Sequence, residues 1–201
     1  MRVPAAGVLG DPPATGYWAL ANGSVFAGID CDTRGLADGE NPLSRIGVAL
    51  GPVEVFASSI TEGTASEAVD AELVRWMEAR SVPERSIIAV GWNVSGGHLA
   101  RIRRALPAFS SRYLTERSIA LDTICYALAD NKTYGDFPTS FEEWQALAKR
   151  AAELHAKIGY EVDPAWDDAG YSALTSLLGW RWLCAIVADP RPATWQDRTG
   201  A

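Results

Sequence analysis

Short apolar runs without helical spacing recur along this chain. Residues 25–29, VFAGI, form one continuous run, which predicts a strand buried on both faces. Residues 45–50 and 53–57 are apolar segments separated by a Gly-Pro pair, so they predict a hairpin whose second strand has one exposed face. Two further strands are expected, at residues 87–90 and 118–123. The first three strands would form a meander.

Apolar residues at helical spacing follow the meander. They predict helices at residues 66–80, 98–106, 141–158 and 166–187. Pro107 would end the second of these helices, and Ser140 with Glu143 would form a capping box at the start of the third. A meander followed by strands that alternate with helices predicts an α/β domain with a mixed sheet flanked by helices.

Length and composition favour a single domain. A chain of 201 residues that is 48% hydrophobic can bury one substantial core. We expect a partly ordered N-terminal arm over residues 1–23, the domain over residues 24–187 and a C-terminal tail over residues 188–201. No apolar run is long enough to cross a bilayer and the N-terminus lacks a signal-peptide pattern, so we expect a cytoplasmic protein without a membrane partner.

Charge and cysteine content narrow the possible functions. The formal net charge of -7 argues against a protein that coats duplex phosphates, but not against an enzyme that grips one nucleic-acid end through bound metal ions. The cysteines are Cys31, Cys125 and Cys184, an odd number at wide spacing in apolar surroundings. We therefore expect buried thiols, not disulfides or a zinc site.

Two aspartates, Asp30 and Asp32, come directly after the first apolar run. Residues two apart on a strand point to the same face, so both carboxylates would project into the space at the end of the strand. Like charges this close repel, and a hard divalent cation would neutralise them. The simpler interpretation is that one Asp faces solvent while the other caps a turn.

Several blocks of sequence in the same order resemble the DEDD-type 3'–5' exonucleases, a family with a ribonuclease-H-like fold. The first block is FAGIDCDTRGL, followed at a suitable distance by RIGVAL, and the second is VGWNVSGGHLARI. The third block is DPAWDDAGYSALTSLL, with SIALDTI lying between the second and the third. The resemblance spans residues 25–178.

This resemblance implies a ribonuclease-H-like fold and a metal-dependent 3'–5' exonuclease that acts on the 3' ends of single-stranded DNA or RNA. Asp30, Asp32 and Asp168 would hold Mg²⁺ or Mn²⁺, with Asp32 in place of the family's Glu. His98 stands where the family has its second Asp, and Asp163 stands where it has the catalytic His. His ligates Mn²⁺ better than Mg²⁺, so the replacement of the family's Asp by His98 leaves open whether the site holds a second metal ion.

The resemblance also implies which residues bind the substrate. Thr33, Gly35 and Leu36 would line the pocket for the terminal nucleotide, although the same segment can be a plain turn. At the mouth of the cleft, Trp92 and Asn93 would meet a splayed base, although a Trp is more often a core residue. Arg101 belongs to a basic stretch with Arg103, Arg104 and Arg112 that could contact phosphates or form a solvated helix face.

Structural roles remain open for the substituted positions. His98 can bond locally at a helix start, and Asp163 can cap the helix that follows Pro164. We expect Asp122, at the end of a predicted strand, to hydrogen-bond a loop. The alternative function is therefore a catalytically inactive, exonuclease-like module that binds nucleic acid or acts as a scaffold.

Overall fold

The computed structural model describes residues 23–33, 43–51, 54–60, 66–129, 138–144, 146 and 168–188. Almost all of the expected N-terminal arm and C-terminal tail, and most of the helix expected at residues 141–158, lie outside these residues. No helix in the described part of the chain combines the length and apolar character needed to cross a membrane.

The core of the fold is one five-stranded mixed sheet with the strand order β3-β2-β1-β4-β5. Its strands are β1 (Val25–Thr33), β2 (Leu43–Ala49), β3 (Val55–Ser59), β4 (Ile87–Gly91) and β5 (Leu114–Ala120). β1, β2 and β3 pair antiparallel, which confirms the meander, whereas β4 pairs parallel to β1 and β5 pairs parallel to β4. This arrangement confirms the expected ribonuclease-H-like α/β fold.

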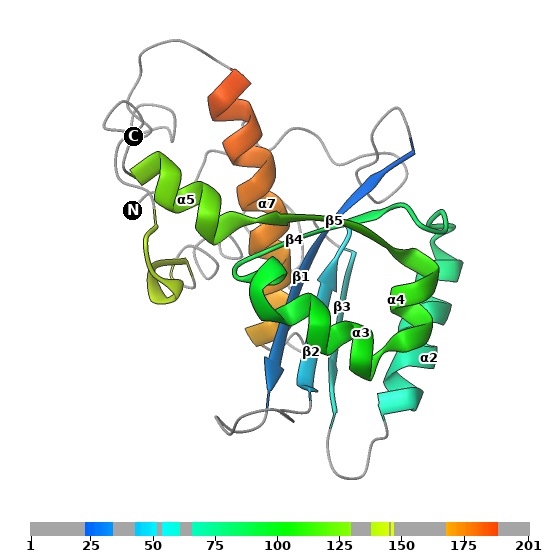
Figure 1. The fold of residues 1–201 in the computed structure, drawn as a ribbon. Coiled ribbons are helices and arrows are strands. Elements are labelled where there is room, and N and C mark those ends of the chain that lie inside the picture. Colours follow the sequence, from blue (N-terminus) through cyan, green and yellow to red (C-terminus); the bar gives the residue numbers. More distant parts are fainter. Residues whose placement is uncertain are drawn as a thin grey trace.

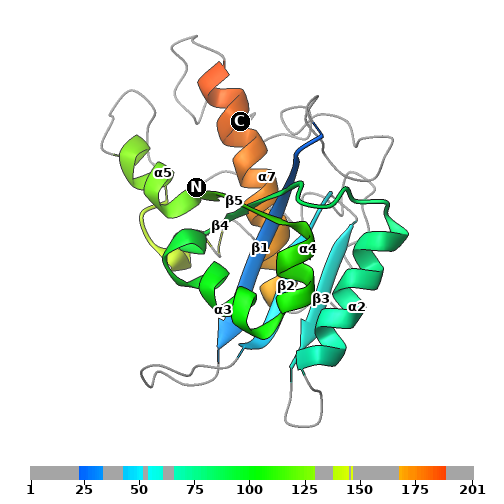
Figure 2. The same cartoon turned by 45° about the vertical axis from the view of Figure 1, so that its right-hand side comes forward.

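Helices cover both faces of the sheet (Figure 1). One face packs against α2 (Ser66–Ala79), α3 (Leu99–Ala105) and α4 (Pro107–Tyr113), and the other packs against α5 (Leu121–Ala129) and α7 (Asp168–Ala188). Figure 2 shows α2 beside β3 at one edge of the sheet and α5 near the opposite edge. The sheet is therefore enclosed, as its continuous apolar strands require.

Two expected elements differ from the structure. The helix expected at residues 98–106 is preceded by a π-helical segment, η1 (Val94–His98), and Pro107 begins α4 instead of only ending α3. Proline suits the first position of a helix because its missing N–H would have no partner there. The strand expected at residues 118–123 ends at Ala120, so Asp122 lies in the first turn of α5 and not at the end of a strand.

The contact between α7 and the sheet depends on two glycines. A Cβ atom at Gly28 would overlap the main-chain oxygen of Ala173, and a Cβ atom at Gly47 would overlap that of Ala169. The helix backbone therefore lies directly on β1 and β2. Gly47 is also the register partner of Asp30, so the first turn of α7 lies at the level of Asp30 on the same face of the sheet.

Candidate active site

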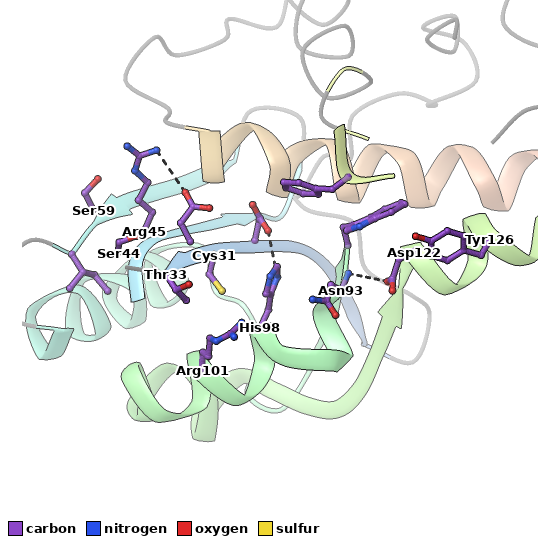
Figure 3. A pocket seen from close by; sticks show the side chains of 15 residues that line it. Cys31, Thr33, Ser44, Arg45, Ser59, Asn93, His98, Arg101, Asp122 and Tyr126 are labelled. Carbon is purple, nitrogen blue, oxygen red and sulfur yellow. Dashed lines mark hydrogen bonds and ion pairs between the residues drawn. The ribbon is translucent and has the colours of Figure 1, made fainter. Parts of the chain in front are cut away.

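A polar pocket of about 940 Å³ lies at the carboxyl end of β1. β1 contributes residues 30–33, and the segment after β4 contributes Trp92, Asn93 and His98. In Figure 3, Arg45 stands at one end of the pocket and Tyr126 of α5 at the other, with His98 and Arg101 between them. The pocket therefore joins segments that are far apart along the chain.

Asp30 lies beyond the point where β4 stops pairing with β1. The last parallel pair is Gly28 with Val90, so β4 leaves the edge of β1 open before Asp30 is reached. Asp30 is only 4% exposed, and its Oδ1 lies 3.5 Å from Nδ1 of His98 (Figure 3). A buried carboxylate therefore meets an imidazole brought to it by η1.

His98 does not have the local role considered from the sequence. It precedes α3, but its side chain makes no capping hydrogen bond, and its buried Nδ1 has no hydrogen-bond partner among the described residues. Burial lowers the pKa of His98 below 6.5, and Arg101 lowers it further, while Asp122 acts in the opposite direction. The imidazole is therefore mainly neutral at pH 7, which is the form that can ligate a metal ion.

Asp32 and Arg45 are neighbours across β1 and β2. Their closest oxygen and nitrogen atoms lie 3.8 Å apart, and the two side chains are 44% and 43% exposed, respectively. An ion pair with this exposure contributes little stability, so the arginine can turn toward another anion without a large cost. Asp32 thus lines the pocket, and its weak ion pair with Arg45 can give way to an interaction with a cation.

Asn93 and Asp122 hold the turn between β4 and η1. The main-chain N–H of Asn93 donates to Oδ1 of Asp122 over 3.0 Å, which confirms the expectation that Asp122 hydrogen-bonds a loop. Asn93 itself has a φ of 52°, a left-handed conformation that Asn tolerates better than most residues. The Asp122 contact therefore helps to set the path of the chain that carries His98.

Trp92 lines the pocket but is only 8% exposed, and it stacks on Trp144 with 5.6 Å between ring centroids. The interpretation of this residue as a core Trp is the one that the structure supports. Ser140 accepts a hydrogen bond from the N–H of Glu143, so the predicted cap forms one turn before Trp144. The Glu143 carboxylate, however, accepts from Thr139 and not from Ser140.

The predicted metal ligands are only partly described. Asp168 begins α7, and the main chain of Ala169, the next residue, lies against Gly47, opposite Asp30. The Asp168 side chain lies outside the described residues, as do Asp163, Gly35 and Leu36. Within the described part of the chain, no group of three or more His, Cys, Asp or Glu residues could hold a metal ion.

The basic stretch does not form one continuous face. Arg101 lines the pocket, together with Thr33 from the end of β1. Arg103 pairs with Glu116, and Arg112 pairs with Glu78 and Glu84 on the α2 side of the sheet. Of these arginines, Arg101 is the one that the structure brings to the predicted site.

Some pocket residues were not predicted from the sequence, above all Arg45, Tyr126 and Phe141. Tyr126 lies on α5, where Leu121 and Cys125 are buried and the tyrosine falls on the opposite, exposed side. The sequence signal that could have revealed Tyr126 was an amphipathic helical pattern with a large aromatic residue on its polar face. It was missed because residues 118–123 were interpreted as a strand.

Together, the fold and the pocket define a class: ribonuclease-H-like α/β proteins with a polar pocket at the carboxyl end of the central strand. No protein-family model and no curated protein matches the chain. Among solved structures, the chain is similar to the EXO domain of Nibbler from Aedes aegypti, with 12% identity and a TM-score of 0.44. The match covers 82% of this chain and 78% of that one.

Proposed function

We propose that this protein is a metal-dependent 3'–5' exonuclease that hydrolyses the terminal phosphodiester of single-stranded nucleic acid. One observation carries the proposal: Asp30 and Asp32 lie on the face of β1 that α7 covers, and α7 begins with Asp168 at the level of Asp30. Acidic residues from distant parts of the chain thus approach one edge of the sheet. Oxygen ligands of this kind suit Mg²⁺ and Mn²⁺.

The orphaned nitrogen of His98 also fits a divalent ion. Its Nδ1 is buried, lacks a hydrogen-bond partner among the described residues and lies 3.5 Å from Asp30. Asp30, Asp32 and Asp168 would hold the ion, with His98 as a further ligand that favours Mn²⁺ over Mg²⁺. A bound ion of this type activates a water molecule and stabilises the leaving oxygen of the phosphodiester.

The remaining residues would position the substrate and move protons. Arg101 supplies a cation inside the pocket, where it would bind a phosphate oxygen. Thr33, with Gly35 and Leu36 by resemblance to the family, would contact the terminal nucleotide. Asp163, which stands at the position of the family's histidine, would act as the general base.

Hydrolysis of a 5'-labelled single strand tests the proposal directly. With Mn²⁺ present, the wild-type protein should shorten the strand one nucleotide at a time from its 3' end. Asp30→Asn should reduce the rate at least about 100-fold, because loss of an outer-shell partner alone often costs 10- to 100-fold in a metal site. Glu72→Gln removes an exposed carboxylate of α2 and should leave the rate unchanged.

Thermal melting tests the metal site without an activity. An ion that binds only the folded protein stabilises it by about 1.4 kcal/mol at ten times its Kd, which raises the Tm of a domain of this size by about 3–5 °C. Mn²⁺ should produce this shift in the wild type and not in Asp30→Asn. Equal shifts in the two proteins, or none in either, would contradict the proposed ligands.

The contacts of Asp30 and Asp32 favour a second candidate function. Asp32 already pairs with Arg45, and Asp30 lies beside His98, so each carboxylate has a neighbour other than a metal ion. A catalytically inactive module that binds single-stranded nucleic acid would keep these contacts. Binding of the labelled strand without any hydrolysis in Mn²⁺ or Mg²⁺ would support this candidate and exclude the exonuclease.

A further inference from the structure

Two exposed aromatic side chains in the described part of the chain meet at the pocket. Among the residues that the structure describes, the large hydrophobic side chains that are exposed are Tyr126, at 49%, and Phe141, at 36%. Both line the pocket that contains Asp30 and His98, although they come from separate segments of the chain. Single exposed apolar residues are common, but exposed rings that converge on one polar cavity mark a ligand surface.

Buried rings hold this aromatic surface in place. Tyr126 lies 6.2 Å from Trp92, measured between ring centroids, and Trp92 in turn stacks on Trp144. Trp144 is only 1% exposed and follows Phe141 by three residues in the same helical turn, so Phe141 is carried by a segment anchored in the core. We call the two exposed rings, Tyr126 and Phe141, the aromatic wall. Because its backing is fixed, a flat ligand would bind with little reorganisation.

The opposite part of the pocket has a different chemistry. Figure 3 shows Arg45, His98 and Arg101 away from Tyr126, with Asp122 beside the tyrosine. Phosphate suits guanidinium groups, whereas the flat face of a nucleobase suits an exposed aromatic ring. A nucleotide carries both groups within one residue. The volume of about 940 Å³ lies within the range of small-ligand sites, so it can admit a nucleotide.

We propose that the aromatic wall is a binding subsite for an unpaired nucleobase, adjacent to the phosphodiester held near Asp30 and Arg101. This inference rests on the proposed function, and it identifies the nucleobase as the part of the substrate that the aromatic wall binds. A base inside a duplex has both faces covered by its neighbours, so Tyr126 and Phe141 would select single-stranded ends. Stacking on aromatic rings uses the face that every base has, so the subsite would tolerate any sequence.

Fluorescence anisotropy with 5'-fluorescein-labelled single strands tests this subsite in EDTA, where no hydrolysis occurs. Two probes of the same sequence are compared, in both DNA and RNA form: one is intact, and the other has abasic residues at its 3' end. Tyr126→Ala and Phe141→Ala should each weaken binding of the intact probe about tenfold, the order expected for one stacked base. The affinity for the abasic probe should be the same in all proteins.

The matched controls separate stacking from folding. Tyr126→Phe keeps the ring and should bind like the wild type, and Thr123→Ala changes an exposed residue of α5 outside the pocket. Each variant should still unfold in one cooperative transition, with the alanine variants only slightly less stable than the wild type, because Tyr126 and Phe141 are partly buried. Unchanged affinity of the Tyr126→Ala, Phe141→Ala double variant, or an equal loss for the abasic probe, would overturn the inference.

The outcomes also distinguish this inference from the proposed function. If binding depends on the base and on the aromatic wall but Mn²⁺ supports no hydrolysis, the subsite stands and the exonuclease proposal fails. If the wild type and the double variant hydrolyse and bind the intact strand equally, the exonuclease proposal stands and the subsite fails. If the wild type binds neither probe in EDTA and hydrolyses no strand in Mn²⁺, both are overturned; absent binding with Mn²⁺-supported hydrolysis overturns the subsite alone.

Discussion

The pairing of Asp30 with His98 is the most informative contact at the scale of single residues. A buried carboxylate next to a mainly neutral imidazole offers one oxygen and one nitrogen donor to the same cavity. In the family that the sequence resembles, the position of His98 carries an Asp. The identity of this one residue therefore determines whether the donors at this end of the pocket are all oxygens.

Replacing His98 by Asp should change the preference for the metal ion. Mg²⁺ binds carboxylates well and imidazoles poorly, whereas Mn²⁺ accepts both. In His98→Asp, the ratio of Mg²⁺-supported to Mn²⁺-supported hydrolysis should rise about tenfold above that of the wild type. Initial rates on the labelled strand, measured at matched concentrations of the two ions, give this ratio. A ratio that does not change would show that His98 is not a ligand.

The thiol of Cys125 should be inert in the native protein. Burial raises its pKa to about 12, and Asp122 contributes in the same direction. Because this value lies above the ordinary pKa of 9, the protonated thiol stabilises the fold fully below pH 9, and that contribution is lost as the pH rises toward 12. At about pH 8, iodoacetamide should label Cys125 only after unfolding, which peptide mass spectrometry would detect. Rapid labelling of the folded protein would contradict the burial.

At the scale of elements, the junction of α7 with β1 and β2 places the acidic residues. Gly28 and Gly47 allow the helix backbone to rest on the strands, and this contact sets the level at which α7 begins. On the other face, the Asp70 carboxylate accepts hydrogen bonds from the N–H groups of Ala108 and Phe109 and so joins α2 to the start of α4. The site therefore depends on helix positions that are determined far from it.

Gly28→Ala should destabilise the protein by about 3 kcal/mol or more, because the added methyl group would overlap the main chain of Ala173, which cannot move away as a side chain can. Urea unfolding of the two proteins measures the difference. Gly23→Ala is the comparison: its φ of 82° disfavours Ala, but no atom lies within 4 Å, so we expect a loss of about 1 kcal/mol. A smaller loss for Gly28→Ala than for Gly23→Ala would refute the close approach of α7.

At the scale of the whole molecule, the negative charge limits how nucleic acid can bind. The chain carries a formal net charge of -7, and within the basic stretch Arg103 and Arg112 are paired with glutamates. The pocket itself is lined by Arg45 and Arg101. Affinity for a single strand would thus depend on contacts inside the pocket and not on a broad basic surface.

Binding should therefore respond only weakly to salt. Each phosphate neutralised on a single strand contributes about −0.7 to the slope of log K against log salt concentration, so contacts from Arg45 and Arg101 alone predict a slope no steeper than about −1.4. Anisotropy titrations over a series of NaCl concentrations measure this slope. A slope steeper than about −3 would indicate a basic surface outside the pocket.

Local sequence pattern was sufficient to predict most of the sheet. The apolar runs located β1 to β4, and the Gly-Pro pair at residues 51–52 predicted the reversal between β2 and β3. β5 was placed too late because three polar residues, which include the exposed Glu116, follow its first residue, and such an edge strand has little apolar pattern. The short helix α5 was missed because its first buried residue, Leu121, falls within residues 118–123, which were interpreted as a strand.

For the candidate site too, local pattern predicted some features and only the folded chain revealed others. Alternation along β1 is a property of neighbouring residues, so it put Asp30 and Asp32 on one face before any tertiary contact was considered. Which group faces Asp30, how deeply His98 is buried and which rings stay exposed depend on segments that meet only in the folded chain. Burial and pKa are properties of these distant neighbours, and no local spacing encodes them. For this reason the two carboxylates could be predicted from local spacing and His98 from the family resemblance, whereas the burial of the imidazole, its contact with Asp30 and the aromatic wall became visible only in three dimensions.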